Sequence, residues 1–245
     1  MKLMATRQVS DIRSFPRRDL DLFVAAGANT LTEEEALAVL ANAYVTPQLC
    51  QIIAQSHRLT AFYSIRLRLV AHRSTPQAHA VKLVHYLHWP DMVRLSIDVR
   101  VPPPVRRALE TQLLLRVGKL SLGEKIASAK RCSPALIKVF LFDPEPKVFA
   151  ALLLNQRVRE DDLVLVATSD RASAEKLLML AADRKWSSRY AVRRALVMNP
   201  LTPRSIAASQ LRFLRAHDLR SIHGNPSTSV YLRRCIERLR PAVID

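Results

Sequence analysis

The chain has 245 residues, a formal net charge of +17 and a composition that is 49% hydrophobic. That hydrophobic content is too high for an intrinsically disordered protein and sufficient to bury a core. Only four glycines stand against fourteen prolines, which argues against folds built on glycine turns or phosphate-binding loops and suits helices that begin with proline.

The N-terminal segment, residues 1–31, is basic but lacks the apolar centre of a secretory signal peptide. We expect an N-terminal arm with a short helix here, and its arginines leave an organelle transit peptide as an alternative. A regular helix is predicted to follow, because Thr32 and Glu35 have the spacing of a capping box. From residue 32 to residue 245 we predict a single all-α domain.

A phrase that ends one helix and begins the next recurs along this domain. In "NPLTP", Asn199 is pushed out of the α region by Pro200, whereas Thr202 can cap a helix whose first residue is Pro203. Equivalent marks occur at Thr46, Thr75, Pro103, Ser133, Arg159, Thr202 and Thr228. Their intervals are 29, 28, 30, 26, 43 and 26 residues. A near-constant period of this length predicts an α-solenoid of about six or seven stacked helical pairs.

Each period is expected to contain a helix A after the cap and a helix B before the next stop. A β-branched residue lies seven positions before four of the stops, at Ile65, Val93, Val148 and Val192. The interval of 43 residues contains three apolar segments and has room for one extra helix. The last segment, residues 228–239, is predicted to be a lone helix that closes the array.

The stretch "AVRRALVMNPLTP", residues 191–203, resembles the leucine-rich repeat variant, whose consensus runs V-R-x-A-(V/L)-A-x-N-P-x-T-P. The resemblance is partial over residues 221–237 and is only a pattern of spacing over residues 32–156. It implies an α-solenoid related to HEAT and armadillo arrays, with no single activity attached. Some members of that family bind an iron–sulfur cluster on clustered cysteines, which this chain lacks. In broad architecture the chain is also similar to helical-repeat DNA glycosylases.

Two long segments, residues 36–90 and 184–217, contain no Asp or Glu. Within them or close by, arginine directly follows the β-branched residue of helix B in three units. The candidate binding site for nucleic acid or an acidic partner is Arg66, Arg68, Arg94, Arg189, Arg193 and Arg194. Because stacked B helices commonly line one surface of a solenoid, these residues predict a positive face suited to a phosphate backbone. The alternative is structural: each arginine bonds to the neighbouring unit and holds the stack together.

The predicted function is a non-catalytic scaffold that binds the phosphate backbone of a nucleic-acid duplex. Single-strand binding would need exposed aromatic residues, and we expect Tyr63, Tyr86 and Tyr190 in the core. One alternative is an interaction module for an acidic protein. A second is a DNA glycosylase that uses Asp91 or Asp183, the carboxylates near the two tryptophans.

Catalysis, a metal and a cofactor are not expected. The chain has no nucleophile elbow, Cys–His signature or phosphate loop. His85 and His88, three apart on one predicted helix, could share a metal ion, but two further ligands are not evident. The three cysteines, Cys50, Cys132 and Cys235, are widely spaced, so we expect packed thiols and a reducing, cytoplasmic location. No apolar run approaches the ~20 residues that cross a bilayer, so no membrane span is predicted.

Overall fold

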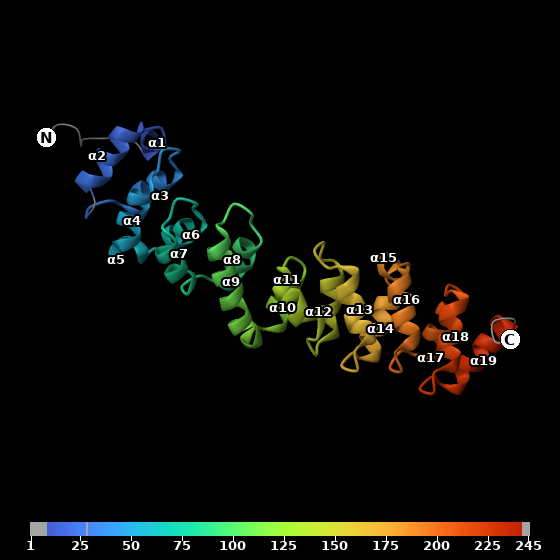
Figure 1. Cartoon of the computed structure of the whole chain (residues 1–245). Coiled ribbons are helices and arrows are strands. Elements are labelled where there is room, and N and C mark those ends of the chain that lie inside the picture. The colour runs from blue at the N-terminus through green and yellow to red at the C-terminus, as the bar shows by residue number, and fades with distance from the viewer. Residues whose placement is uncertain (1–8, 28, 242–245) are drawn as a thin grey trace. The chain divides into compact units, whose positions relative to one another are not determined.

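The computed structural model describes residues 9–27 and 29–241, and every regular element in those ranges is a helix (Figure 1). The all-α prediction is therefore confirmed for the described part of the chain. The chain divides into two compact units, residues 1–119 and 120–245. The predicted single domain over 32–245 includes this division, and its unity stays a prediction. Among the described helices, none is both long and apolar enough to cross a bilayer.

Unit 1 consists of short helices joined by short loops. Its elements are α1 (Val9–Ile12), α2 (Arg17–Gly27), α3 (Glu33–Ala41), α4 (Pro47–Gln55), α5 (His57–Thr60), α6 (Tyr63–Ala71), α7 (Gln77–Val84), α8 (Trp89–Ser96), α9 (Pro103–Arg116) and the 3₁₀ turn η1 (Val117–Lys119). Helices α1 and α2 lie in the predicted N-terminal arm, and α1 packs against α3.

Unit 2 has the same construction. Its elements are α10 (Leu122–Ala129), α11 (Pro134–Leu141), α12 (Pro146–Leu153), α13 (Glu160–Thr168), α14 (Ala174–Ala182), α15 (Arg184–Ser187), α16 (Tyr190–Met198), α17 (Arg204–Leu211), α18 (Ala216–Gly224) and α19 (Val230–Leu239). The extra helix predicted in the interval of 43 residues is confirmed, since α13, α14 and α16 all lie there, with the short α15 between the last two.

Two predicted helix starts are confirmed in atomic detail. Thr32 begins α3 with a capping box: its hydroxyl accepts from the Glu35 N–H at 3.3 Å, and the Glu35 carboxylate accepts from the Thr32 N–H at 2.8 Å. Thr46 caps α4 by accepting from the Leu49 N–H, with Pro47 as the first helical residue. Both caps satisfy N–H groups that would otherwise lack a partner.

The start predicted at Thr202 was wrong. Helix α17 begins at Arg204 with Pro203 before it, and the buried Thr202 hydroxyl has no hydrogen-bond partner within the described residues. The reason is a turn closed by the Thr202 N–H, which donates to the Asn199 carbonyl and keeps Thr202 inside the loop. In the second phrase it is Ser229, not Thr228, that caps α19.

The stop residue has a role beyond ending a helix. Helix α16 ends at Met198, and Asn199 is extended (φ −81°, ψ 121°), as expected. Its side-chain amide also donates to the carbonyls of Ala167 at 2.7 Å and Ser169 at 3.0 Å, at the end of α13. Its side-chain oxygen accepts from the Leu201 N–H at 2.9 Å. One buried side chain thus joins the ends of α13 and α16 and shapes the loop after α16.

Two other asparagines repeat this arrangement. Asn155 donates to the carbonyls of Ala129 at 2.8 Å and Cys132 at 3.4 Å, and its side-chain oxygen accepts from the Arg157 N–H. Asn42 joins the end of α3 in the same way to the carbonyl of Ile12, the last residue of α1, and to that of Phe15. We call Asn42, Asn155 and Asn199 the asparagine clamps.

Unit 2 repeats the helices of unit 1 at a constant interval of 127 residues. Helices α3, α4, α5, α6 and α7 each have a counterpart of equal length that begins 127 residues later, namely α13, α14, α15, α16 and α17. The cap residues correspond as well: Thr46 and Ser173 cap α4 and α14, and Ser56 and Asp183 cap α5 and α15. We call residues that lie 127 positions apart in the two units equivalent. The helical-pair period is therefore nested within a larger repeat.

The predicted β-branched residues lie in the core. Ile65, Val148 and Val192 are fully buried and Val93 is nearly so. Of the residues that directly follow them, Phe149 is buried, Arg94 is exposed, and Arg66 and Arg193 are intermediate. The neighbours of Arg66 and Arg193 therefore decide whether these two side chains hold the stack together or face a ligand.

Candidate nucleic-acid interface

A tyrosine–aspartate junction fixes the start of helix B in both units. The Tyr63 hydroxyl donates to the Asp91 carboxylate at 2.5 Å and accepts from the His88 N–H at 3.2 Å, which joins α6 to α8. The equivalent Tyr190 hydroxyl donates to Asp218 and accepts from the Arg215 N–H, which joins α16 to α18. Burial, and then the bond to the carboxylate, raise the pKa of Tyr63 and of Tyr190. Both phenols stay protonated at neutral pH and act as donors.

Arg66 and Arg193 lie one turn after these tyrosines, and both are half-buried. The Arg193 Nε donates to the Ser187 carbonyl at 2.5 Å, and its guanidinium lies 3.9 Å from the Phe213 ring centre. Arg66 has only a long bond of 3.4 Å to the Ala61 carbonyl, and its guanidinium is 5.8 Å from the Tyr86 ring. Its buried Nε has no partner in the described part of the chain. The structural alternative therefore fits Arg193 better than Arg66.

Arg94 and Arg194 pair with the carboxylates of the junctions. Arg94 forms an ion pair with Asp91 at 2.9 Å and Arg194 with Asp218 at 2.9 Å, and the two arginine side chains are 64% and 46% exposed. The Tyr190 bond, followed by the Arg194 charge, lowers the pKa of Asp218. These two arginines add less positive potential than unpaired cations would.

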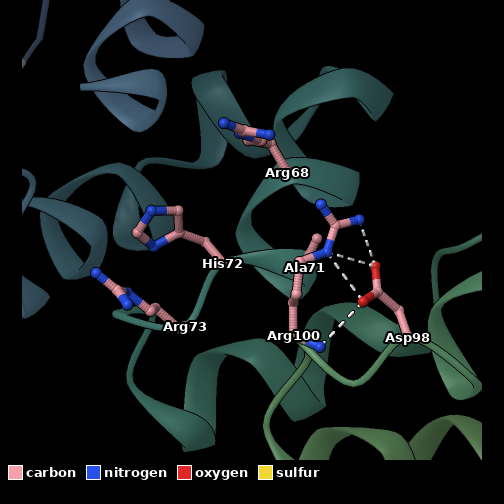
Figure 2. A pocket seen from close by; sticks show the side chains of 6 residues that line it. All are labelled: Arg68, Ala71, His72, Arg73, Asp98 and Arg100. Carbon is pink, nitrogen blue, oxygen red and sulfur yellow. Dashed lines mark hydrogen bonds and ion pairs between the residues drawn. The ribbon is translucent and has the colours of Figure 1, made fainter. Parts of the chain in front are cut away.

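Arg68 belongs to a basic cavity of about 320 Å³ at the ends of α6 and α8 (Figure 2). His72, Arg73, Asp98 and Arg100 also line it. Figure 2 shows Asp98 turned toward Arg100, and two guanidinium bonds of 3.0 and 2.7 Å join them. These bonds hold the pKa of Asp98 at about 2. The side chains of Arg68 and Arg73 have no ion pair or hydrogen bond to any residue in 9–27 or 29–241, so two uncompensated cations line this cavity.

His72 lies between these two arginines, in surroundings that disfavour its protonation. Its Nδ1 accepts from the Ser74 N–H at 3.1 Å and lies 3.8 Å from the Cys50 sulfur. Burial, and then the charges of Arg68 and Arg73, lower the pKa of His72. An added positive charge is therefore unfavourable at this position in the folded state.

Acidification is expected to destabilise unit 1 through His72. Because the pKa of the folded state is below that of the unfolded chain, about 6.5, the unfolded state binds the proton more readily and stability falls as the pH drops below that value. Changing His72→Asn, the residue at the equivalent position 199, should reduce this pH dependence. Urea unfolding followed by Trp89 fluorescence in a Trp186→Phe background reports on unit 1. Equal pH dependence in the parent and in His72→Asn would contradict this prediction.

Arg189 precedes α16 and is exposed. It lies near two further exposed cations, Arg184 and Lys185, of which Lys185 lies 4.0 Å from the Trp186 ring centre. Unit 2 thus has its own group of cations at the junction of α15 and α16.

The six predicted arginines do not form one site. Arg66 and Arg68 share a helix but line separate cavities, and Arg189, Arg193 and Arg194 lie within two turns at the start of α16. The sequence interpretation left Arg73 and Arg100 outside the site. Arg73 could have been found from its place in an acid-free segment, whereas no local pattern links Arg100 to Arg68.

The structure does not place the histidines considered as metal ligands on one helix, and it gives structural bonds to the carboxylates considered for catalysis. His85 and His88 are not on one helix as predicted, because α7 ends at Val84 and α8 begins at Trp89. Within the described residues, no cluster of three or more His, Cys, Asp or Glu side chains could hold a metal ion. Asp91 bonds to Tyr63 and Arg94, and Asp183 caps α15.

The cysteines and Tyr86 lie in different environments. Cys50 and Cys132 are buried thiols, as expected, and burial raises the pKa of Cys132 to about 12. Tyr86, expected in the core, is 62% exposed, because it follows the end of α7 and lies outside the helix that the sequence pattern extended over it.

Comparisons of the chain with protein-family models, with curated proteins and with solved structures found no match. The relationship to the leucine-rich repeat variant and to HEAT arrays stays a prediction.

Proposed function

We propose that this chain is an α-solenoid scaffold that binds nucleic acid through the phosphate backbone of a duplex. The repeated junctions and the asparagine clamps support the solenoid, because they connect successive B helices within a unit by the same bonds. The observation that supports a phosphate backbone as the ligand is the cavity of Figure 2, where the Arg68 and Arg73 side chains are exposed and have no partner in the described residues that compensates their charge.

Phosphate contacts account for these features better than base readout does. Guanidinium groups match phosphate oxygens in geometry and charge. Residues 36–90, which contain Arg68 and Arg73, have no carboxylate that would repel a backbone. Binding of this kind depends on counterion release and is largely independent of base sequence.

A salt series with a 5′-hydroxyl, blunt-ended DNA duplex tests the proposal. Affinity should fall steeply with salt, and the double change Arg68→Ala with Arg73→Ala should reduce the log–log slope by roughly two, one per lost phosphate contact. The double change Lys130→Ala with Arg131→Ala is the matched control. It removes the same charge from exposed positions outside the acid-free segments and should leave the slope close to that of the parent.

Two results would count against the proposal. The first is an equal loss of slope in both double variants, which would indicate a response to net charge alone. The second is tighter binding to a polyglutamate of matched charge than to the duplex, which would favour the acidic-protein alternative.

A further inference from the structure

Unit 1 has a second cavity, of about 350 Å³, formed by α4 to α7 and the loop after α7. Its polar and aromatic lining consists of His57, Thr60, Arg66, His79, Lys82 and Tyr86. A volume of this size lies in the range of small-molecule sites, at the lower end.

The lining favours an anion. It contains no carboxylate, and Arg66, Lys82 and the two histidines converge on it from three helices. The side chains of His57, His79 and Lys82 have no hydrogen bond or ion pair to another residue in the described ranges, and the buried Arg66 Nε is likewise without a partner. Unsatisfied donors around a concave space are suited to the oxygens of a phosphate.

An aromatic face adjoins these donors. The Tyr86 ring is 62% exposed and lies 5.8 Å from the Arg66 guanidinium. An exposed ring beside a phosphate-binding group is the arrangement on which a nucleobase stacks while its phosphate is held.

The equivalent residues of unit 2 show that the repeat does not need His79 and Lys82 in order to fold. His79 corresponds to Ile206 and Lys82 to Ser209, so two of the basic residues are replaced by uncharged ones, whereas His57 corresponds to Arg184 and stays basic. The equivalent of Arg66, Arg193, is already bonded to Ser187 and stacked on Phe213. The basic side chains of His79 and Lys82 are therefore not explained by packing of the repeat.

We propose that this cavity binds the 5′-terminal nucleotide of a nucleic acid, with the phosphate on Arg66 and Lys82 and the base on Tyr86. A terminal phosphate has more charge than an internal phosphodiester and three acceptor oxygens, which suits donors that arrive from several helices. The choice of a nucleic acid as the source of the nucleotide rests on the proposed function. The shared chemistry is that of a nucleoside monophosphate.

The experiment compares one short single-stranded oligonucleotide with a 5′-phosphate or a 5′-hydroxyl, with AMP as a competitor. The 5′-phosphate should tighten binding to the parent chain by about tenfold, as expected for hydrogen bonds to a charged group. Lys82→Ser and His79→Ile, which introduce the residues of unit 2, should each reduce this preference. Lys130→Ser, the same change at another exposed lysine, should preserve it.

Equal affinity of the parent for both ends would overturn the proposal, and so would a preference that persists in both cavity variants. Tighter binding of AMP than of the phosphorylated oligonucleotide would also overturn it, in favour of a free-nucleotide site. The hydroxyl-ended duplex separates this proposal from the backbone function. Salt-dependent duplex binding by the parent chain, with no preference of the parent for a 5′-phosphate, sinks the end-binding proposal alone.

Discussion

Changing Asn199→Ala is expected to lower the free energy of unfolding of unit 2 by about 3 kcal/mol. The substitution removes two donors to the carbonyls at the end of α13 and one acceptor from the Leu201 N–H. Ala167 is fully buried, so its carbonyl is poorly placed to recover a bond from water. The penalty for unsatisfied buried groups then outweighs the modest net worth of each hydrogen bond.

The measurement uses urea unfolding in a Trp89→Phe background, where buried Trp186 is the remaining tryptophan and reports on unit 2. Asn225→Ala is the matched control, because the half-buried Asn225 side chain shapes its own loop by accepting from the Ser227 N–H at 3.0 Å. It should cost about 1 kcal/mol or less. A loss at Asn199 no larger than that at Asn225 would contradict the clamp interpretation.

Changing Lys176→Met is expected to destabilise unit 2 by about 2 kcal/mol. Lys176 is 3% exposed, and its ammonium donates to the carbonyls of Leu141 at 3.1 Å and Asp143 at 2.6 Å, where α11 ends. Methionine fills a similar volume but leaves both carbonyls without this donor.

One effect opposes this loss. Burial lowers the pKa of Lys176, although the charge of Asp143 partly counteracts the shift. Removing a buried ammonium therefore recovers some desolvation free energy, which is why the expected cost is less than that of two charged hydrogen bonds. The Trp89→Phe background again reports unfolding, and Glu175→Ala, at an exposed neighbour, should change stability by no more than about 0.5 kcal/mol. Equal stability of Lys176→Met and its parent would show that the recovered desolvation free energy is as large as the loss of the two hydrogen bonds.

The position of the arginines directly after a buried β-branched residue could be predicted from the sequence, but the contacts that each arginine makes could not. Arg66 and Arg193 occupy equivalent positions after a buried β-branched residue. They differ because Arg193 reaches the Ser187 carbonyl and Phe213, whereas Arg66 lies beside an open cavity with Tyr86 at a greater distance. These differences depend on residues up to 20 positions away that another helix brings into contact.

The sequence by itself determined the all-α class, the starts of α3 and α4 at Thr32 and Thr46, and the stop at Asn199. Capping, proline sterics and helical periodicity act within a few residues, so a local pattern is enough to predict them. Only the tertiary structure decided that the Asn199 side chain reaches Ala167, 32 residues earlier. It also placed Arg66 and Arg68 in different cavities, because residues two apart on a helix point to different sides and each side meets different neighbouring elements.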